Sequence, residues 1–303
     1  MGHHWIPVVH LRSFSADSEL GRKAHIVAYD VAKNRFLPEE TTVSKVVQRK
    51  RLYDPSREQA KAPLEARAVS ILQRMSASPG ALAITEDERD HVALYVAMLT
   101  EQNPAYQEWV LDMAKRYIEL APPNLDPRIQ IESSKEDVER EAFAGVPKMA
   151  TLLCEKTWHV WIRCEPPYFL IGDDPIVFAQ SQDPKLRPSP GGIVSMALPI
   201  SPTAVLVTLN HPPDHESVSE ARENRVHTIN LAIYEQTNRL IFGRKRTDFA
   251  GLLEYLSLSK RLGKPGDRKG PFRPSLEDLR PGFNQMIAEA EAELAKRDAR
   301  KIS

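Results

Sequence analysis

The feature that most constrains this fold is a change of pattern near residue 157. Between residues 63 and 153, apolar side chains recur at the three- and four-residue spacing of amphipathic helices. After residue 157, short runs rich in β-branched and aromatic residues are separated by Pro, Gly and Asp. Helices and strands that are segregated along a chain favour an α+β architecture over an alternating, doubly wound sheet. We therefore predict an α+β fold.

The helical part is predicted to be a bundle of four consecutive helices. Two of them begin at the spacing of a capping box, Thr85 with Glu88 and Ser133 with Glu136. The other two are predicted to cover residues 63–75 and to start at residue 104.

The part that follows is predicted to be a mostly antiparallel sheet with flanking helices. Ser217 with Glu220 has the spacing of a helix cap, so we expect a helix from there to about residue 236. A returning strand at 239–243 and a short helix at 247–257 complete this part. An N-terminal β-hairpin is predicted to pair 24–30 with 35–37. The strand candidates are TWHVWIRC, YFLIG, PIVFA, IVSMALPI and AVLVTL.

We expect residues 1–257 to form one α+β domain, followed at 258–303 by a basic linker and a charged terminal helix. Lys+Arg and Asp+Glu are equal at 41 each. The chain therefore lacks the overall basic excess typical of nucleic-acid or membrane coats, although a local basic patch stays possible. Cys154 and Cys164 both lie in apolar surroundings, which predicts reduced core thiols and a cytoplasmic protein. No apolar run is long enough to suggest a membrane partner.

The opening stretch, HHWIPVVHLRSF, is the first candidate site. Pro7 is suited to the start of a short helix, which would bring His3, His4 and His10 into a small volume. Imidazoles so placed suit a transition metal, or equally a set of structural hydrogen bonds. We expect Arg12 to be partly buried and to need an anionic partner. That partner is either an internal acid such as Glu65 or Asp174, or a ligand.

The second candidate is the GDDP turn, where two carboxylates follow an apolar strand. Asp173 and Asp174 would point into a cleft, where they would hold a divalent cation or act as a general base. The alternative is an ordinary turn, since Asp before Pro is a good turn initiator.

Other polar positions are less informative. Asn230 falls in the apolar stripe of a predicted helix, so its amide either pins a backbone segment or orients one of the acids. The sequence has no Gly-rich phosphate loop, GxSxG elbow, HExxH or CxxC motif. HPPDH (211–215) fits a surface turn better than a metal site.

The residues HHWIPVVHLRSF resemble the opening signature of a bacterial family of unknown function (DUF4238-like). The similarity spans roughly residues 3 to 245, including the VAYD strand, the Leu64-Glu65 helix, GDDP, LPISP and the Ile229-Asn230 pair. It implies a shared fold and a shared site at His3, His4, Arg12, Glu65, Asp173 and Asp174, but no reaction. In TEQNPAY, Gln102 or Asn103 stands where the family often has an arginine.

Two functions from different classes follow from these residues. The first is a metal-dependent hydrolase acting on a phosphodiester or nucleotide. In this hydrolase, His3, His4 and Asp174 would hold Mg, Mn or Zn. The catalytic groups would be Arg12, Glu65 and Asp173. His10 and Asn230 would be structural or orienting residues. The second is a non-catalytic defence or regulatory module that recognises nucleic acid, peptide or a small anion. Arg12 and the basic loops SKVVQRKR, GRKR and SKRLGKPGDRKG would make the contact with nucleic acid or nucleotide.

Overall fold

The structure of the protein is a computed structural model. It describes residues 2–39, 41–46, 48–50, 55–77, 79–101, 103–122, 125–126, 135–179, 195–209, 216–261, 287–296 and 299. Helices α2 (Pro55–Met75), α3 (Glu86–Glu101), α4 (Pro104–Leu120) and α5 (Lys135–Cys154) follow one another, as the sequence predicts. The other helices and turns are α1 (Val8–Leu11), η1 (Arg12–Phe14), η2 (Ser18–Lys23), α6 (Glu223–Gln236), η4 (Arg246–Phe249) and α7 (Ala250–Arg261).

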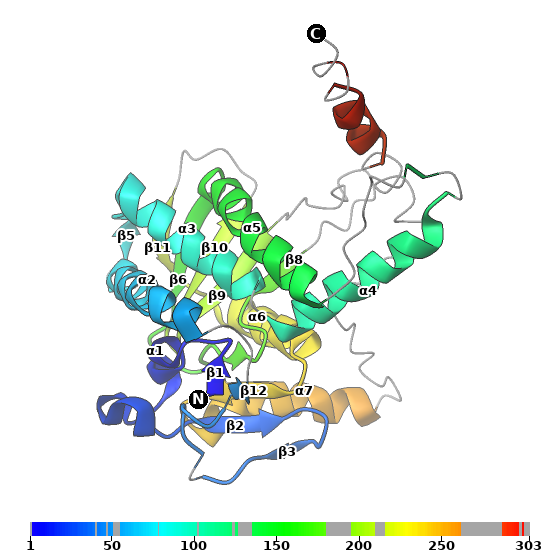
Figure 1. Ribbon diagram of the computed structural model, residues 1–303. Coiled ribbons are helices and arrows are strands. Elements are labelled where there is room, and N and C mark those ends of the chain that lie inside the picture. The colour runs from blue at the N-terminus through cyan, green and yellow to red at the C-terminus, as the bar shows by residue number, and fades with distance from the viewer. Residues whose placement is uncertain are drawn as a thin grey trace.

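The strands form two main sheets and a two-stranded ribbon (Figure 1). The larger sheet has the order β5-β11-β6-β10-β9-β8 and the smaller one the order β3-β2-β12-β7. The α+β prediction is therefore confirmed. The strands are β1 (Gly2–His4), β2 (Val27–Asp30), β3 (Arg35–Phe36), β4 (Gln48–Lys50), β5 (Gly80–Ala81), β6 (Thr157–Ile162), β7 (Ile171–Gly172), β8 (Val177–Ala179), β9 (Ser195–Ser201), β10 (Ala204–Leu209), β11 (Ser217–Glu220) and β12 (Leu240–Gly243).

Helices α2, α3 and α5 cover one face of the larger sheet (Figure 1). Their apolar stripes share one core with alternate residues of the central strands, including Trp158, Val160 and Leu206, all essentially inaccessible to solvent. On the other face, α6 and α7 pack against a second core that reaches the smaller sheet through residues such as Phe169 and Ile241. Burial of apolar surface on both faces supplies the main stabilisation of this layer.

The predicted N-terminal hairpin is confirmed. Strands β2 and β3 pair antiparallel with Tyr29 opposite Phe36 and Asp30 opposite Arg35. Asn34, in the turn, has a φ of 53°. Asn tolerates this left-handed conformation better than most residues do. The apolar N-terminal residues Ile6 and Phe14 are fully buried, which ties this part of the chain to the core of the smaller sheet.

Two local predictions are wrong. Residues 217–220 form strand β11, which runs parallel to β6, and helix α6 starts only at Glu223. The run 168–172 also leaves the predicted single sheet, because β7 pairs with β12 of the smaller sheet. Alternating patterns identify strands but carry no information on which strand lies beside which.

Three further expectations have mixed outcomes. Helix α2 starts at Pro55, eight residues before the predicted 63–75 segment, and contains Pro63. Cys154 is partly buried, but Cys164 is exposed in the loop after β6, so the prediction of two core thiols is wrong. The Ser133 cap, HPPDH and most of the basic linker lie outside the described residues. In the described part of the chain, no helix has the length and apolar character needed to cross a membrane.

Candidate functional site at the GDDP turn

Asp173 is buried and serves as a backbone anchor. Its carboxylate accepts three hydrogen bonds, from the backbone N–H groups of Asn238, Arg239 and Leu240, at 2.9, 2.9 and 3.0 Å. Its own N–H donates to the Leu240 carbonyl at 2.8 Å. These bonds fix the turn after β7 against the start of β12. These bonds give the Asp173 carboxylate a structural role at the turn.

Asp174, the next residue, has a different environment. It is partly exposed. Burial around its carboxylate and the negative charge of Asp173 raise its pKa to about 7, against the opposing hydrogen bonds from the Ile176 N–H and the Asn103 side chain. A carboxyl group with a pKa near neutrality can both accept and release a proton at physiological pH. Two adjacent acids thus differ in their availability for chemistry.

The opening stretch meets this turn through Trp5. The Trp5 indole Nε1–H donates to the Asp173 carbonyl at 2.8 Å. His4 precedes Trp5 in the chain and Asp174 follows Asp173, so both are sequence neighbours of this hydrogen-bonded pair. In strand β1, His3 lies opposite Arg49 and His4 opposite Gln48 of β4. The side chains of His3 and His4 lie outside the described residues.

His10 is buried in a structural network. Its Nε2 lies 2.8 Å from the Pro199 carbonyl and its Nδ1 lies 2.7 Å from the Tyr95 hydroxyl. A carbonyl only accepts, so Nε2 carries the proton and Tyr95 donates to Nδ1. Burial lowers the His10 pKa to about 4, although the Pro199 bond opposes the shift. The neutral ring joins α1 to α3 and β9.

Arg12 lies at the start of η1 and is partly buried. Its backbone is paired, since the N–H donates to the Val8 carbonyl and the carbonyl accepts from the Ser15 N–H and hydroxyl. Neither Glu65 nor Asp174 forms an ion pair with its guanidinium among the described residues. Within the described part of the structure, no salt bridge to Arg12 is present.

Glu65 lies on α2, close enough to Tyr95 for its charge to add to the effect of burial, and both raise the Tyr95 pKa. Lys61 lies one helical turn earlier, is only 6 % exposed, and projects from the same face of α2. Sequence reasoning missed Lys61. The sequence signal for Lys61 is its position four residues before Glu65, which places both on one face of a helix. Pro63 lies between them and argues against a helix there, so this signal is weak.

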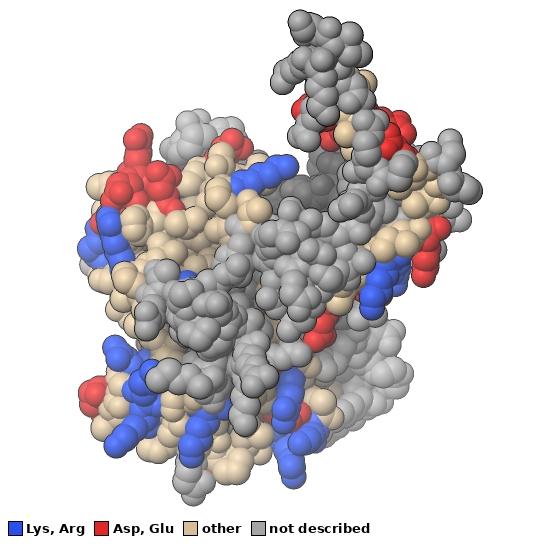
Figure 2. All heavy atoms as spheres, viewed as in Figure 1, with Lys and Arg blue, Asp and Glu red and all other residues tan. Residues whose placement is uncertain are grey.

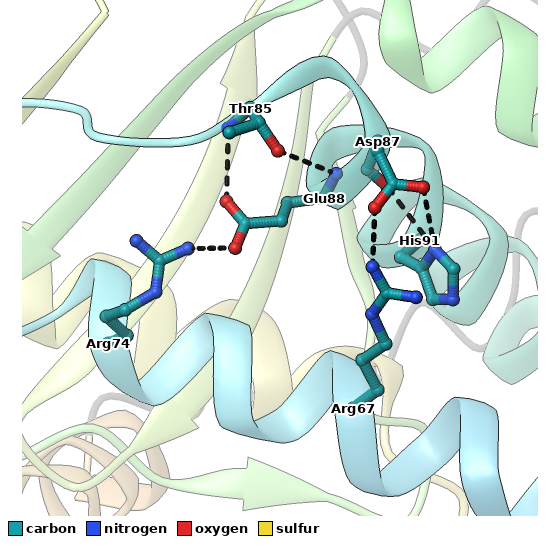
Figure 3. Close-up of polar contacts among 6 residues, drawn as sticks. All are labelled: Arg67, Arg74, Thr85, Asp87, Glu88 and His91. Carbon is teal, nitrogen blue, oxygen red and sulfur yellow. Dashed lines mark hydrogen bonds and ion pairs between the residues drawn. The ribbon is translucent and has the colours of Figure 1, made fainter.

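Ion pairs hold α2 against α3, which carries Tyr95 and leads to Asn103 (Figure 3). The predicted capping box is confirmed: Glu88 N–H donates to Thr85 Oγ1 at 3.3 Å and Thr85 N–H to Glu88 Oε2 at 3.1 Å. From α2, Arg74 pairs with Glu88 and Arg67 with Asp87, both at 2.5 Å. These contacts link α2 to the start of α3.

Asn230 lies in the buried stripe of α6. Its Oδ1 accepts from Leu170 N–H at 2.9 Å and its Nδ2 donates to the Tyr168 carbonyl at 2.8 Å. The amide therefore pins the segment that enters β7. Asn230 therefore acts on the GDDP turn through the backbone, because its amide oxygen and nitrogen bind Leu170 and Tyr168 and not the two acids.

The structure thus brings the Trp5 side chain of the opening stretch to the Asp173 backbone, and places Asn103 near Asp174. The sequence alone marks position 102 or 103 only as a departure from the family pattern. Arg12, Glu65 and His10 contact neither acid within the described residues. In that part of the chain, no three His, Cys, Asp or Glu side chains form a group able to hold a metal ion.

Comparison with known proteins identifies the family. A family model described as "Protein of unknown function (DUF4238)" matches residues 2–247. The chain belongs to this family. Searches of curated proteins and of solved structures returned no match.

Proposed function

We propose that the protein is a hydrolase in which Asp174 moves the proton. The observation that carries the proposal is the contrast between the adjacent acids. Asp173 is engaged by three backbone N–H groups, while Asp174 keeps partial exposure and has a pKa raised to about 7. A carboxyl group whose pKa is raised towards neutrality is a candidate for acid–base chemistry.

A phosphodiester or nucleotide substrate is favoured by Arg12. Its guanidinium is partly buried and forms no ion pair with the described residues. Planar guanidinium groups bind phosphate oxygens in a bidentate manner and stabilise charge that develops on them. Arg12 would therefore contact the anionic substrate while Asp174 activates water.

A divalent ion, Mg, Mn or Zn, is part of this proposal. Asp174 would supply one ligand, and His4, together with His3, the others, since Trp5 places this segment beside the turn. The ion would lower the pKa of a bound water. Because the cation binds the ionised carboxylate, it would favour the deprotonated form of Asp174.

The test is hydrolysis of bis(p-nitrophenyl) phosphate with and without Mn²⁺, from pH 5 to pH 9. The rate should rise as Asp174 loses its proton near pH 7, and Asp174→Asn should remove activity while leaving the protein folded. Asp90→Asn, on the exposed surface of α3, is the matched control. Binding of the substrate without turnover at any pH would contradict the hydrolase and favour the non-catalytic module.

A further inference from the structure

Exposed cations gather around the smaller sheet. They come from η2, the β2–β3 hairpin, the loop after it, and the segments on either side of β12. Figure 2 shows Lys and Arg along the lower part of the molecule, where these segments lie, and a group of acidic side chains over the start of α3. We call this surface the basic face. Its residues are Arg22, Lys23, Lys33, Arg35, Lys45, Arg239, Lys245 and Arg246.

Acids of the same segments neutralise part of this charge, since Asp30 pairs with Arg239 and Lys33, and Glu39 pairs with Arg246. The eight cations still outnumber the four acids Glu19, Asp30, Glu39 and Asp248. Asp30 and Asp248 are buried, and their carboxylates bind backbone N–H groups. Among the described residues of these segments, the exposed acids are Glu19 and Glu39. A net charge of zero for the whole chain therefore conceals a separation of charge, with a positive surface at the smaller sheet.

Sheet pairing brings together cations that are far apart in the sequence. Asp30 lies opposite Arg35 on one side and Leu240 on the other, so Arg35 and Arg239 flank the same strand end. The Asp30 carboxylate lies 3.2 Å from Arg239 Nε and 4.0 Å from Lys33 Nζ. Neighbouring strands are about 4.8 Å apart. One polyanion backbone can thus meet several of these cations at once.

Two contacts orient Arg246, which lies in the segment after β12. The Arg246 guanidinium lies over the Phe36 ring, 5.2 Å from its centroid, and 3.2 Å from Glu39. A guanidinium that is already oriented loses less conformational freedom when it binds a phosphate. The basic face is thus partly organised before any partner arrives.

We propose that the basic face binds the phosphodiester backbone of a nucleic acid. Its guanidinium and ammonium groups match phosphates spaced along a polymer, and a backbone-directed contact needs no base-specific pocket. The inference does not depend on hydrolysis. It adds to the proposed function, because the Arg239 N–H binds Asp173, so the face borders the GDDP turn and a polymer bound there would pass beside Asp174.

The test is fluorescence anisotropy with labelled 20-nucleotide single-stranded RNA and duplex DNA of mixed sequence, titrated at several salt concentrations. Affinity should fall steeply with salt, with little dependence on sequence. Lys33→Ala with Arg35→Ala should weaken binding and reduce the salt slope by about 1 for each phosphate that the two side chains neutralise. The control, Lys115→Ala with Lys148→Ala on the exposed surfaces of α4 and α5, should bind like the wild type.

Several results would overturn the proposal: no binding of either oligonucleotide, no dependence on salt, or equal affinity in the Lys33/Arg35 and control variants. Binding to phosphatidylserine vesicles without binding to the oligonucleotides would also overturn it. Asp174→Asn separates the two proposals. Retained binding without cleavage supports both, whereas unaltered cleavage with retained binding refutes only the role of Asp174 in hydrolysis.

Discussion

The two sheets are stabilised in different ways. The larger one is covered on both faces by helices, and its strands of up to seven residues bury side chains such as Trp158, Leu198 and Leu206. The smaller sheet has strands of only two to four residues. Each of the three buried aspartates among the described residues, Asp30, Asp173 and Asp248, binds backbone N–H groups at its margins.

This difference shows how a short-stranded sheet is closed. Few ladder hydrogen bonds form, so the N–H groups of the flanking turns need other acceptors. Carboxylates supply them. Asp248, for example, accepts from Arg244 and Lys245 N–H at 3.0 and 2.9 Å. The larger sheet should therefore be sensitive to loss of apolar volume, and the smaller one to loss of a carboxylate.

The largest effect is expected in the larger sheet. Trp158 is 1 % exposed and its indole N–H donates to the Leu153 carbonyl at 2.9 Å. Trp158→Ala removes the ring and leaves a cavity, so we expect the free energy of unfolding to fall by about 4 kcal/mol. Urea denaturation measures this. A loss below about 1 kcal/mol would contradict the conclusion that burial of apolar side chains stabilises the larger sheet.

Asp173→Ala tests the smaller sheet. Three backbone N–H groups would lose their acceptor, which should cost about 3 kcal/mol because buried unpaired donors are penalised. The same denaturation experiment measures the loss, and hydrogen exchange at Asn238, Arg239 and Leu240 should become faster. Asp173→Asn, which retains one oxygen, should lie between the wild type and Asp173→Ala. Equal stability of the three proteins would remove Asp173 from the anchoring role.

His10 connects the two regions and predicts a dependence on pH. Its pKa is about 4 in the folded protein and near 6.5 when exposed. Between these values the unfolded chain binds the extra proton, so His10 lowers stability as the pH falls below 6.5. The loss should reach about 2 kcal/mol at pH 5.

Comparison with His10→Gln isolates this contribution. The substitution removes the titrating ring, so the difference in unfolding free energy between the two proteins should shrink as the pH falls from 7 to 5. A difference that stays constant over this range would show that His10 has an ordinary pKa in the folded protein.

The smallest effect is expected at Asp174, and it has the opposite sign. Its folded pKa of about 7 lies above the unfolded value, so the stability it contributes at low pH is lost as the pH rises to 7. The full shift corresponds to about 4 kcal/mol, but solvent screens this partly exposed carboxyl group. Asp174→Asn, which cannot ionise, should therefore be more stable than the wild type at pH 8 by about 1 kcal/mol. Thermal unfolding at pH 5 and pH 8 measures the change. Destabilisation at both values would make Asp174 an anchor like Asp173.

Much of the fold follows from local pattern. Periodicity predicts α2 to α5, and the Thr85–Glu88 spacing predicts the start of α3, because both depend on residues a few positions apart. The pairing of β7 with β12 does not follow, since it depends on contacts between residues about 70 positions apart. Ser217 and Glu220 show the same limit: a cap pattern is overridden when the segment finds a parallel partner in β6.

The candidate site also has one part that the sequence predicts and another that only the fold creates. GDDP and the opening stretch are visible in the sequence as polar residues in apolar surroundings. Which aspartate is engaged is not visible, because the three N–H donors belong to the distant 238–240 backbone. Asn103 gives no local signal either, since its relation to Asp174 is created by the packing of α3 beside the turn.

The order of the smaller sheet, β3-β2-β12-β7, also has a consequence for synthesis on the ribosome. Strand β12 lies between β2 and β7. Both β2 and β7 therefore lack β12 as a neighbour until residue 243 has been synthesised. At about 5 to 20 residues per second, the N-terminal hairpin waits roughly 10 to 40 s for that partner. During this interval Ile6 and Phe14 lack the Phe242 side chain of their final core. The nascent chain therefore exposes part of this apolar core until β12 is in place.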